Sequence, residues 1–259
     1  MSLLVLDQVS VAVGPVTLVE SVNLEIAPGQ LLAIIGPNGA GKTSLLRAIA
    51  GDIPSRGRID FAGSPLAALA PETRARQLAV LTQHNTLNFA FTVAEVVGLG
   101  RGPHSTGYAL DNQLCQEAMA ALDVAHLSGR NYLSLSGGEQ QRVQLARVMA
   151  QIWRAEDAPQ RLLLLDEPVT SLDIGHQHQL MQAVRRFADS GVAVVMVVHD
   201  ITLAAAYSDT LLALAGGRTV AAGNPETVVT EALIGELFNT RVRVLPHPET
   251  GKPVVLGAQ

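Results

Sequence analysis

The chain has 259 residues and a formal net charge of −5 at pH 7, and 48% of its residues are hydrophobic and 16% charged. These values are typical of a folded protein with a large core, exclude a disordered chain, and disfavour a nonspecific electrostatic grip on nucleic acid. Cys115 is the only cysteine, which excludes an intrachain disulfide and a cysteine-built metal site and favours a reducing compartment.

The N-terminus and the apolar runs give no signal for export or for membrane insertion. Residues 1–7 lack the basic start, long apolar stretch and small-residue cleavage site of a secretory signal. The longest apolar runs, such as residues 192–198, fall short of the roughly 18 to 20 residues that span a bilayer as a helix. We therefore expect a cytoplasmic protein that reaches a membrane only through a partner.

Apolar periodicity and turn residues predict an α/β fold. Two β-rich segments come first, and later strands that are apolar throughout alternate with helices, which is typical of a mostly parallel sheet covered on both faces. Residues 85–132 contain no strong strand candidate and are expected to form a helical insertion. The expected strands are residues 3–13, 17–26, 31–35, 58–61, 78–82, 161–166 and 192–199, and the expected helices are residues 42–50, 71–76, 92–99, 138–153 and 173–189.

A glycine-rich loop lies between a predicted strand and a predicted helix. Its sequence is Gly36, Pro37, Asn38, Gly39, Ala40, Gly41, Lys42 and Thr43, followed by Ser44. Glycines allow successive backbone N–H groups to turn toward one anion, Lys42 can reach the outer phosphates, and the Thr43 hydroxyl can bind Mg²⁺. The expected ligand is a nucleoside triphosphate; the alternative is a glycine-rich turn without a ligand.

Two carboxylates follow four leucines at the end of another predicted strand. Adjacent acids at the end of a buried strand are costly unless a cation or a catalytic task uses them. In a triphosphatase, Asp166 would hold Mg²⁺ and Glu167 would polarise the attacking water as general base. A strand end that faces solvent is the alternative interpretation.

The segment Leu135-Ser136-Gly137-Gly138-Glu139 leads into the predicted helix of residues 138–153. Ser136 is a candidate N-cap, and the glycines leave the helix start open to an anion. At this segment the chain resembles the ATP-binding cassette (ABC) family, whose signature is Leu-Ser-Gly-Gly-Gln or Leu-Ser-Gly-Gly-Glu. The resemblance covers nearly the whole chain. It implies that the signature of one copy closes over the phosphates held by a second, head-to-tail copy.

The other markers of the family occur in the expected order along the chain. Gln83 matches the Q-loop residue that senses Mg²⁺ and couples to the transport subunits. Asp173, in Thr170-Ser171-Leu172-Asp173, matches the loop that crosses the dimer interface, and His199 matches the switch histidine that contacts the γ-phosphate. The resemblance therefore implies ATP hydrolysis by attack of water on the γ-phosphate, with ATP and Mg²⁺ as the bound groups.

The resemblance also implies a domain plan. It gives one nucleotide-binding domain over residues 1–259, with a phosphate-loop NTPase core and an N-terminal antiparallel β subdomain. The core is residues 1–84 and 133–240, the helical subdomain is residues 85–132, and a C-terminal hairpin is residues 241–259. Two positions depart from the family pattern: Val13 stands where an aromatic residue usually stacks on adenine, and Val169 replaces a common threonine. How adenine is bound is left open.

Sequence features that are less specific than these motifs resemble those of ATPases from importers of large chelates. Residues 199–209 resemble those of ATPases for iron-siderophores, cobalamin and haem, and residues 151–160 with 176–178 resemble hemin import ATP-binding proteins. This resemblance implies a peripheral ATPase at the cytoplasmic face of the bacterial inner membrane. Its expected partners are a second copy, two transmembrane permease subunits and, indirectly, a periplasmic binding protein. The helical insertion is the candidate docking surface, and Asn88-Phe89-Ala90-Phe91 is a possible aromatic contact within it.

Alternative functions remain open from sequence. The same ATPase could energise siderophore or cobalamin import, or it could be a soluble cassette protein acting on ribosomes or DNA. A small-molecule kinase would explain the phosphate loop but neither Ser136 nor His199. The histidines suggest a haem or metal site, but His176 and His178 lie about 200° apart around a helix, and the others are scattered. We expect solvated or structural roles for His84, His104, His126, His176, His178 and His247.

Overall fold

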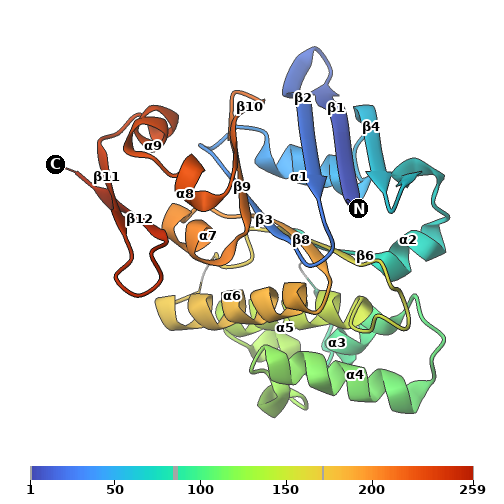
Figure 1. Ribbon diagram of the computed structural model, residues 1–259. Helices are drawn as coiled ribbons and strands as arrows, with labels where there is room; N and C mark the ends of the chain where they lie inside the picture. The colour runs from blue at the N-terminus through green and yellow to red at the C-terminus, as the bar shows by residue number, and fades with distance from the viewer. Residues whose placement is uncertain (1, 84–86, 171, 259) are drawn as a thin grey trace. The chain divides into compact units, whose positions relative to one another are not determined.

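The computed structural model describes residues 2–83, 87–170 and 172–258 (Figure 1). The chain divides into two compact units, which are described separately below. The first unit comprises residues 1–68 and 193–259, and the second comprises residues 69–192. The predicted helical subdomain falls within the second unit, and the predicted domain boundaries remain a prediction.

The first unit begins with an antiparallel sheet, as the sequence predicts. Its strand order is β2-β1-β4-β5, with β1 pairing antiparallel to both β2 and β4 (Figure 1). Along β1, Leu4, Leu6, Val9 and Val11 are buried, so one face of the sheet packs into the core. The strands are β1 (Leu4–Val13), β2 (Val16–Ile26), β4 (Arg56–Phe61) and β5 (Ser64–Pro65), and the short 3₁₀ helix η1 (Leu66–Ala68) follows them.

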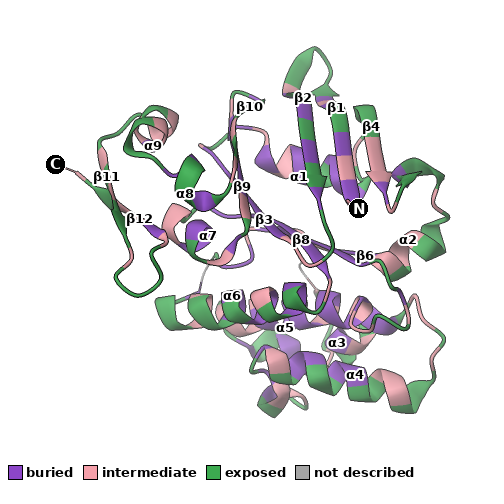
Figure 2. Cartoon of the chain, in the orientation of Figure 1, coloured by how far each residue is buried: buried purple, intermediate pink, exposed green. Residues whose placement is uncertain are grey.

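A second group of strands in the first unit is mostly parallel. Strand β3 pairs parallel with both β8 and β9, and β9 pairs antiparallel with β10. Every residue of β3 and β8 is buried (Figure 2), which explains their continuous apolar sequence. Helix α1 packs against β8 and α7 against β3. The bounds are β3 (Leu31–Ile35), α1 (Lys42–Ala50), β8 (Ala193–Val197), α7 (Ile201–Tyr207), β9 (Thr210–Ala215) and β10 (Arg218–Gly223).

The first unit ends in two short helices and the predicted hairpin. The hairpin strands pair from Val242↔Gly257 to Pro246↔Pro253, and the backbone N–H of Val255 donates to the Thr202 hydroxyl of α7 at 3.0 Å. This contact attaches the hairpin to the unit. The elements are α8 (Pro225–Val228), α9 (Glu231–Phe238), β11 (Val242–Pro246) and β12 (Pro253–Gly257).

The second unit contains one pair of parallel strands and most of the helices. Helix α5 packs against α3, α4 and β6. The predicted helical insertion, residues 85–132, contains helices, single helical turns and, in its described part, one isolated β-bridge between Thr92 and Asn131, so its helical character agrees with the prediction. The elements are α2 (Pro71–Gln77), β6 (Leu78–Leu81), α3 (Val93–Gly98), η2 (Leu99–Arg101), α4 (Tyr108–Ala121), η3 (Ala125–Leu127), η4 (Tyr132–Ser134), α5 (Gly137–Gln151), β7 (Leu162–Asp166) and α6 (Ile174–Asp189).

A buried arginine organises the connection between α5 and β7. Arg101 is 4% exposed and lies 2.8 Å from Asp111 of α4 and 2.8 Å from Asp157 of the connection. Its Nη1 also donates to the carbonyl of Ala150, near the end of α5. A guanidinium with this many partners compensates its own burial. The arginine thereby fixes the segment that leads into β7.

Cys115 lies on α4 and is buried, and burial raises the pKa of its thiol.

None of the described helices combines the length and the apolar character needed to cross a bilayer.

Candidate functional site

The glycine-rich loop of residues 36–43 occupies the turn from β3 into the start of α1, as predicted. Gly36, Gly39 and Gly41 have φ values of +147°, +77° and +96°, which L-residues rarely adopt. A Cβ on Gly36 would lie 2.1 Å from the Leu214 carbonyl oxygen, and one on Gly41 would lie 2.3 Å from that of Leu18. A Cβ on Gly39 would meet no atom of the described chain within 4 Å. Two glycines therefore allow tight packing beneath the loop, and the third lies where a ligand can approach.

Lys42 is held at this loop by backbone carbonyls. Its side chain is largely buried, and Nζ donates to the carbonyl oxygens of Gly36 at 2.8 Å and Pro37 at 2.9 Å. The ammonium thus lies at the beginning of the loop, although the residue is at the start of α1. An ammonium beside consecutive loop peptides at a helix N-terminus suits the binding of phosphate oxygens.

Parallel pairing places His199 at the same sheet edge as the glycine-rich loop. In the register of β3 against β8, Ile34 lies opposite Val197. Gly36 and His199 each follow these paired residues by two positions, so both come at the same end of the two parallel strands. His199 is exposed, and the next residue, Asp200, caps α7 by accepting from the Leu203 N–H at 2.9 Å. The sequence prediction that both residues lie at strand ends is therefore confirmed, and the first unit brings their segments to one edge.

The second unit has an equivalent edge at β6 and β7. Leu81 pairs with Leu165, so Gln83 and Glu167 also come two residues after paired positions. Gln83 Nε2 donates to Glu167 Oε2 at 3.0 Å. Asp166, the last residue of β7, is 3% exposed. The structure therefore brings together the predicted Q-loop glutamine and the predicted acidic pair.

Glu167 has an unusual backbone conformation. Its φ of +53° lies in the left-handed region, which costs roughly 1 to 2 kcal/mol for a residue of this type. The Thr170 hydroxyl donates to Glu167 Oε2 at 3.3 Å, and Gln141 Nε2 on α5 donates to the Pro168 carbonyl at 3.2 Å. Sequence reasoning did not identify Thr170 or Gln141 as supports of this turn. Their polar side chains near the motifs were the only available signal.

Ser136 is the N-cap of α5, as predicted. Its hydroxyl accepts from the Glu139 N–H at 3.3 Å, and Glu139 Oε2 accepts from the Ser136 N–H at 2.8 Å. These reciprocal bonds form a capping box. Hydrogen bonds from the Ser136 hydroxyl and then from its backbone N–H lower the pKa of Glu139. Ser136 and Gly137 are exposed, so the start of α5 is on the surface of the unit.

Asp173 is the N-cap of α6. Its Oδ1 accepts from the His176 N–H at 2.9 Å, and its Oδ2 lies 2.8 Å from His176 Nδ1. The backbone bond from His176, followed by the bond from the imidazole, lowers the pKa of Asp173. Ser171, in the same predicted loop, lies outside the described residues, as does His84.

The histidines do not form a metal site in the described part of the chain, where no cluster of three potential ligands occurs. His176 pairs with Asp173, and His104 Nε2 lies 2.7 Å from the Gln151 carbonyl oxygen. Burial, ahead of smaller effects of its neighbours, lowers the pKa of His104. For these two histidines the expected structural role agrees with their contacts.

Comparison with known sequences identifies close relatives. The family model of ABC transporters matches residues 19–170. The hemin import ATP-binding protein HmuV of Pseudomonas entomophila (strain L48) is 49% identical over 244 residues, covering 94% of this chain and 95% of that protein. The protein of the same name from Gloeobacter violaceus is 51% identical over 242 residues, covering 92% and 88% of the two chains.

Solved structures share the fold. An ATP-binding cassette of an ABC transporter in its ADP conformation has a TM-score of 0.79 at 20% identity, covering 92% of this chain and 98% of that one. The ATP-binding subunit of another ABC transporter has a TM-score of 0.78 at 24% identity, also covering 92% and 98%. The predicted fold class is thereby confirmed. Its sequence relatives and its fold together show that this chain belongs to the ABC transporter family.

Proposed function

We propose that this chain is the ATP-hydrolysing subunit of a bacterial ABC importer whose cargo is hemin. One observation carries the choice of cargo: relatives that are 46 to 51% identical over most of the chain are named hemin import ATP-binding proteins. Siderophore or cobalamin import is the next candidate. Residues 199–209 resemble the corresponding residues of ATPases from those importers. In addition, the cargo of an importer is selected by its other subunits, so this chain alone does not determine it.

The first unit supplies the triphosphate cradle in this proposal. Gly39 leaves open space at the loop, and Lys42 contributes a positive charge there. The triphosphate would be bound by the loop residues Gly36, Pro37, Asn38, Gly39, Ala40, Gly41, Lys42, Thr43 and Ser44. Val13 and Val16, both exposed at the tip of the β1–β2 hairpin, provide aliphatic rather than aromatic surface.

The residues available to hold Mg²⁺ fit that ion. Asp166 supplies a buried carboxylate at a strand end, and Thr43 and Gln83 supply hydroxyl and amide oxygens; hard oxygen ligands of this kind suit Mg²⁺. When bound, the ion would neutralise charge on the β- and γ-phosphates.

Glu167 is the proposed general base. The Gln83 amide and the Thr170 hydroxyl orient its carboxylate, and a water hydrogen-bonded to it would lose a proton as it attacks the γ-phosphate. His199 would contact the γ-phosphate from the end of β8. Positioning and charge stabilisation supply the catalysis, because phosphoryl transfer requires little covalent work from the protein.

The site is completed by a second copy of the chain. The exposed start of α5 would present Ser136, Gly137, Gly138 and Glu139 to the nucleotide of the partner, and Asp173 would lie at the same interface. Two permease subunits would dock on the helical subdomain, where Phe89 is 67% exposed and lies 6.0 Å from Phe91 between ring centroids. A periplasmic binding protein would deliver the cargo, and this chain would lie at the cytoplasmic face.

Transport measurements test the cargo. The chain would be reconstituted in liposomes with the permease encoded beside it, with hemin, ferric siderophore and cobalamin offered separately. We expect ATP-dependent uptake of hemin alone. Uptake of cobalamin or siderophore in its place would reject hemin but keep the importer. ATPase activity stimulated by DNA or ribosomes and not by the permease would reject import.

The role of Glu167 has a separate test. Glu167→Gln should keep ATP binding, lower turnover by about 100-fold or more, and retain a dimer on size-exclusion chromatography in ATP. The matched control is Glu156→Gln, which changes an acid on the connection before β7. Turnover by the Glu167 variant that equals that of the control would remove Glu167 from its role.

A further inference from the structure

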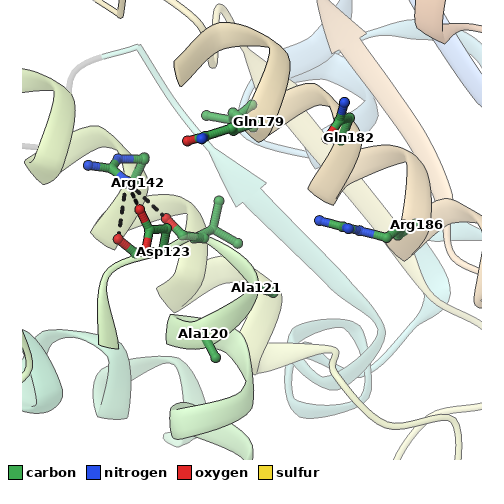
Figure 3. A pocket seen from close by; sticks show the side chains of 9 residues that line it. Ala120, Ala121, Asp123, Arg142, Gln179, Gln182 and Arg186 are labelled. Carbon is green, nitrogen blue, oxygen red and sulfur yellow. Dashed lines mark hydrogen bonds and ion pairs between the residues drawn. The ribbon is translucent and has the colours of Figure 1, made fainter. Parts of the chain in front are cut away.

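A positively charged pocket lies entirely within the second unit. It has a volume of about 210 Å³ and is lined by the end of α4, by Arg142 of α5, and by Gln179, Gln182 and Arg186 of α6. The three α6 residues are spaced i, i+3 and i+7, so they share one face of that helix. In Figure 3, Gln179 and Arg186 extend from α6, whereas Arg142 and Asp123 lie on the other side of the pocket.

Arg142 is buried with part of its hydrogen-bonding capacity unused. The residue is 6% exposed, and its Nη1 donates to the carbonyl oxygens of Asp123 at 3.1 Å and Leu122 at 3.4 Å (Figure 3). Its Nε is buried and has no hydrogen-bond partner among the described residues. A guanidinium carries five N–H donors, and leaving a buried donor unpaired is unfavourable.

Arg186 adds a second cation. Among the described residues, no carboxylate forms an ion pair with it, whereas the adjacent Arg185 lies 2.8 Å from Asp189. The one acid that lines the pocket is Asp123, whose side chain is 71% exposed and whose Oδ2 lies 3.5 Å from Arg142 Nη1. Two guanidinium groups against one solvent-screened carboxylate leave an excess of positive charge.

From this geometry we propose that the pocket binds a small oxyanion, a phosphate or a carboxylate, between Arg142 and Arg186. Planar guanidinium groups bind both anions with paired N–H···O bonds, and the Gln179 amide can add another donor. The alanines at the end of α4 leave room for such a group. A bound anion would tie α6 to the end of α4 and to α5. The proposal concerns binding only and does not depend on the proposed transport function.

Arginine side-chain NMR tests the proposal at the pocket itself. The full chain, labelled with ¹⁵N, would be titrated with inorganic phosphate and separately with succinate at constant ionic strength. The Nε–Hε signals of Arg142 and Arg186 should shift in a saturable manner with at least one of the two anions. A response to phosphate alone, or to succinate alone, would identify the source of the oxyanion. Phosphate bound at residues 36–43 would not produce these shifts.

Three variants sharpen the test. Arg186→Gln should weaken binding by roughly tenfold, because it removes a charged donor, whereas Arg185→Gln should bind as the wild type does. Asp123→Asn should strengthen binding by removing the competing carboxylate, and asparagine tolerates the φ of +53° at this position. The proposal fails if neither anion shifts the two signals, or if the Arg186 and Arg185 variants bind equally well.

Discussion

Two helices of this chain begin at segments expected to contact phosphate, and their first turns are built differently. Helix α1 starts after Gly41, a residue without a side chain to cap it, and has no acidic residue in its first turn. Helix α5 starts after Ser136, whose hydroxyl is engaged by Glu139 in a capping box. Both helix N-termini carry the same kind of partial positive charge. The side chains next to that charge differ between the two helices.

The difference concerns how strongly each helix start favours an anion. The α1 start combines left-handed glycines with the Lys42 ammonium, so charge and backbone conformation both favour phosphate. At α5, the Glu139 carboxylate already occupies the helix start and repels a second anion. We infer that α1 forms the permanent cradle, and that α5 contributes only when a partner brings a phosphate close to Ser136 and Gly137.

Replacing a glycine by alanine should give the largest difference in stability between the two helix starts. Gly36→Ala should destabilise the chain by about 3 kcal/mol or more, because its Cβ would meet the Leu214 carbonyl at 2.1 Å and φ is +147°. Gly137→Ala should change stability by less than about 1 kcal/mol, since its Cβ meets no described atom within 4 Å. Urea unfolding measures both, and equal losses would contradict the difference.

Removing the cation of α1 should give the next largest effect. Lys42→Ala should weaken binding of an ATP analogue by about tenfold or more, because it deletes the ammonium at the loop. Arg47→Ala, in the last turn of the same helix, is the matched control. Titration calorimetry on both variants, with circular dichroism to check folding, provides the measurement. Unchanged affinity in the Lys42 variant would argue against a phosphate site here.

The cap of α5 should contribute less and can be compared with a second capping box in the same unit. Ser136→Ala and Thr92→Ala each remove the serine or threonine of a box and should each cost about 1 kcal/mol of stability. Only Ser136→Ala should also lower ATP turnover, because only that hydroxyl is proposed to meet a partner's nucleotide. An equal fall in turnover for both would assign Ser136 a purely structural role.

The smallest expected effect is on pH dependence. The capping box lowers the pKa of Glu139 below its unfolded value, so its contribution is present above the ordinary glutamate pKa. That contribution is lost as pH falls through the lowered folded value. Glu139→Gln should therefore flatten the acid side of the stability curve measured by urea unfolding. A curve that coincides with that of the wild type would show that the charge of Glu139 is unimportant for the cap.

Local sequence signals predicted the elements on which the site is built. Strand β3 and helix α1 have the predicted bounds, and Gly51 caps the end of α1 in a left-handed conformation. Ser136 is the predicted N-cap because capping depends on neighbours three residues apart. In these cases the residues that determine the local structure are close together in the chain, so the structure can be predicted from a short stretch of sequence.

The remaining features depend on distant parts of the chain. The bond between Gln83 and Glu167 follows from the register of β6 against β7, which neither segment specifies alone. The left-handed conformation of Glu167 could not be read from a residue type that disfavours it. Strands β9 and β10 and helices α7 to α9 were not predicted individually, since they are short, and a short apolar run such as that of β9 does not by itself distinguish a strand from a helix.

Cys115 has a practical consequence for testing the two-copy arrangement. The thiol is buried within α4 and its pKa is raised, so maleimide reagents, which require an accessible thiolate, should modify it slowly. Cysteines introduced at exposed positions such as Asn38 and Gly137 would then be the principal labelling sites. The natural chain is thus nearly a cysteine-free background, on which spin labels or bifunctional reagents can report the spacing between subunits during turnover.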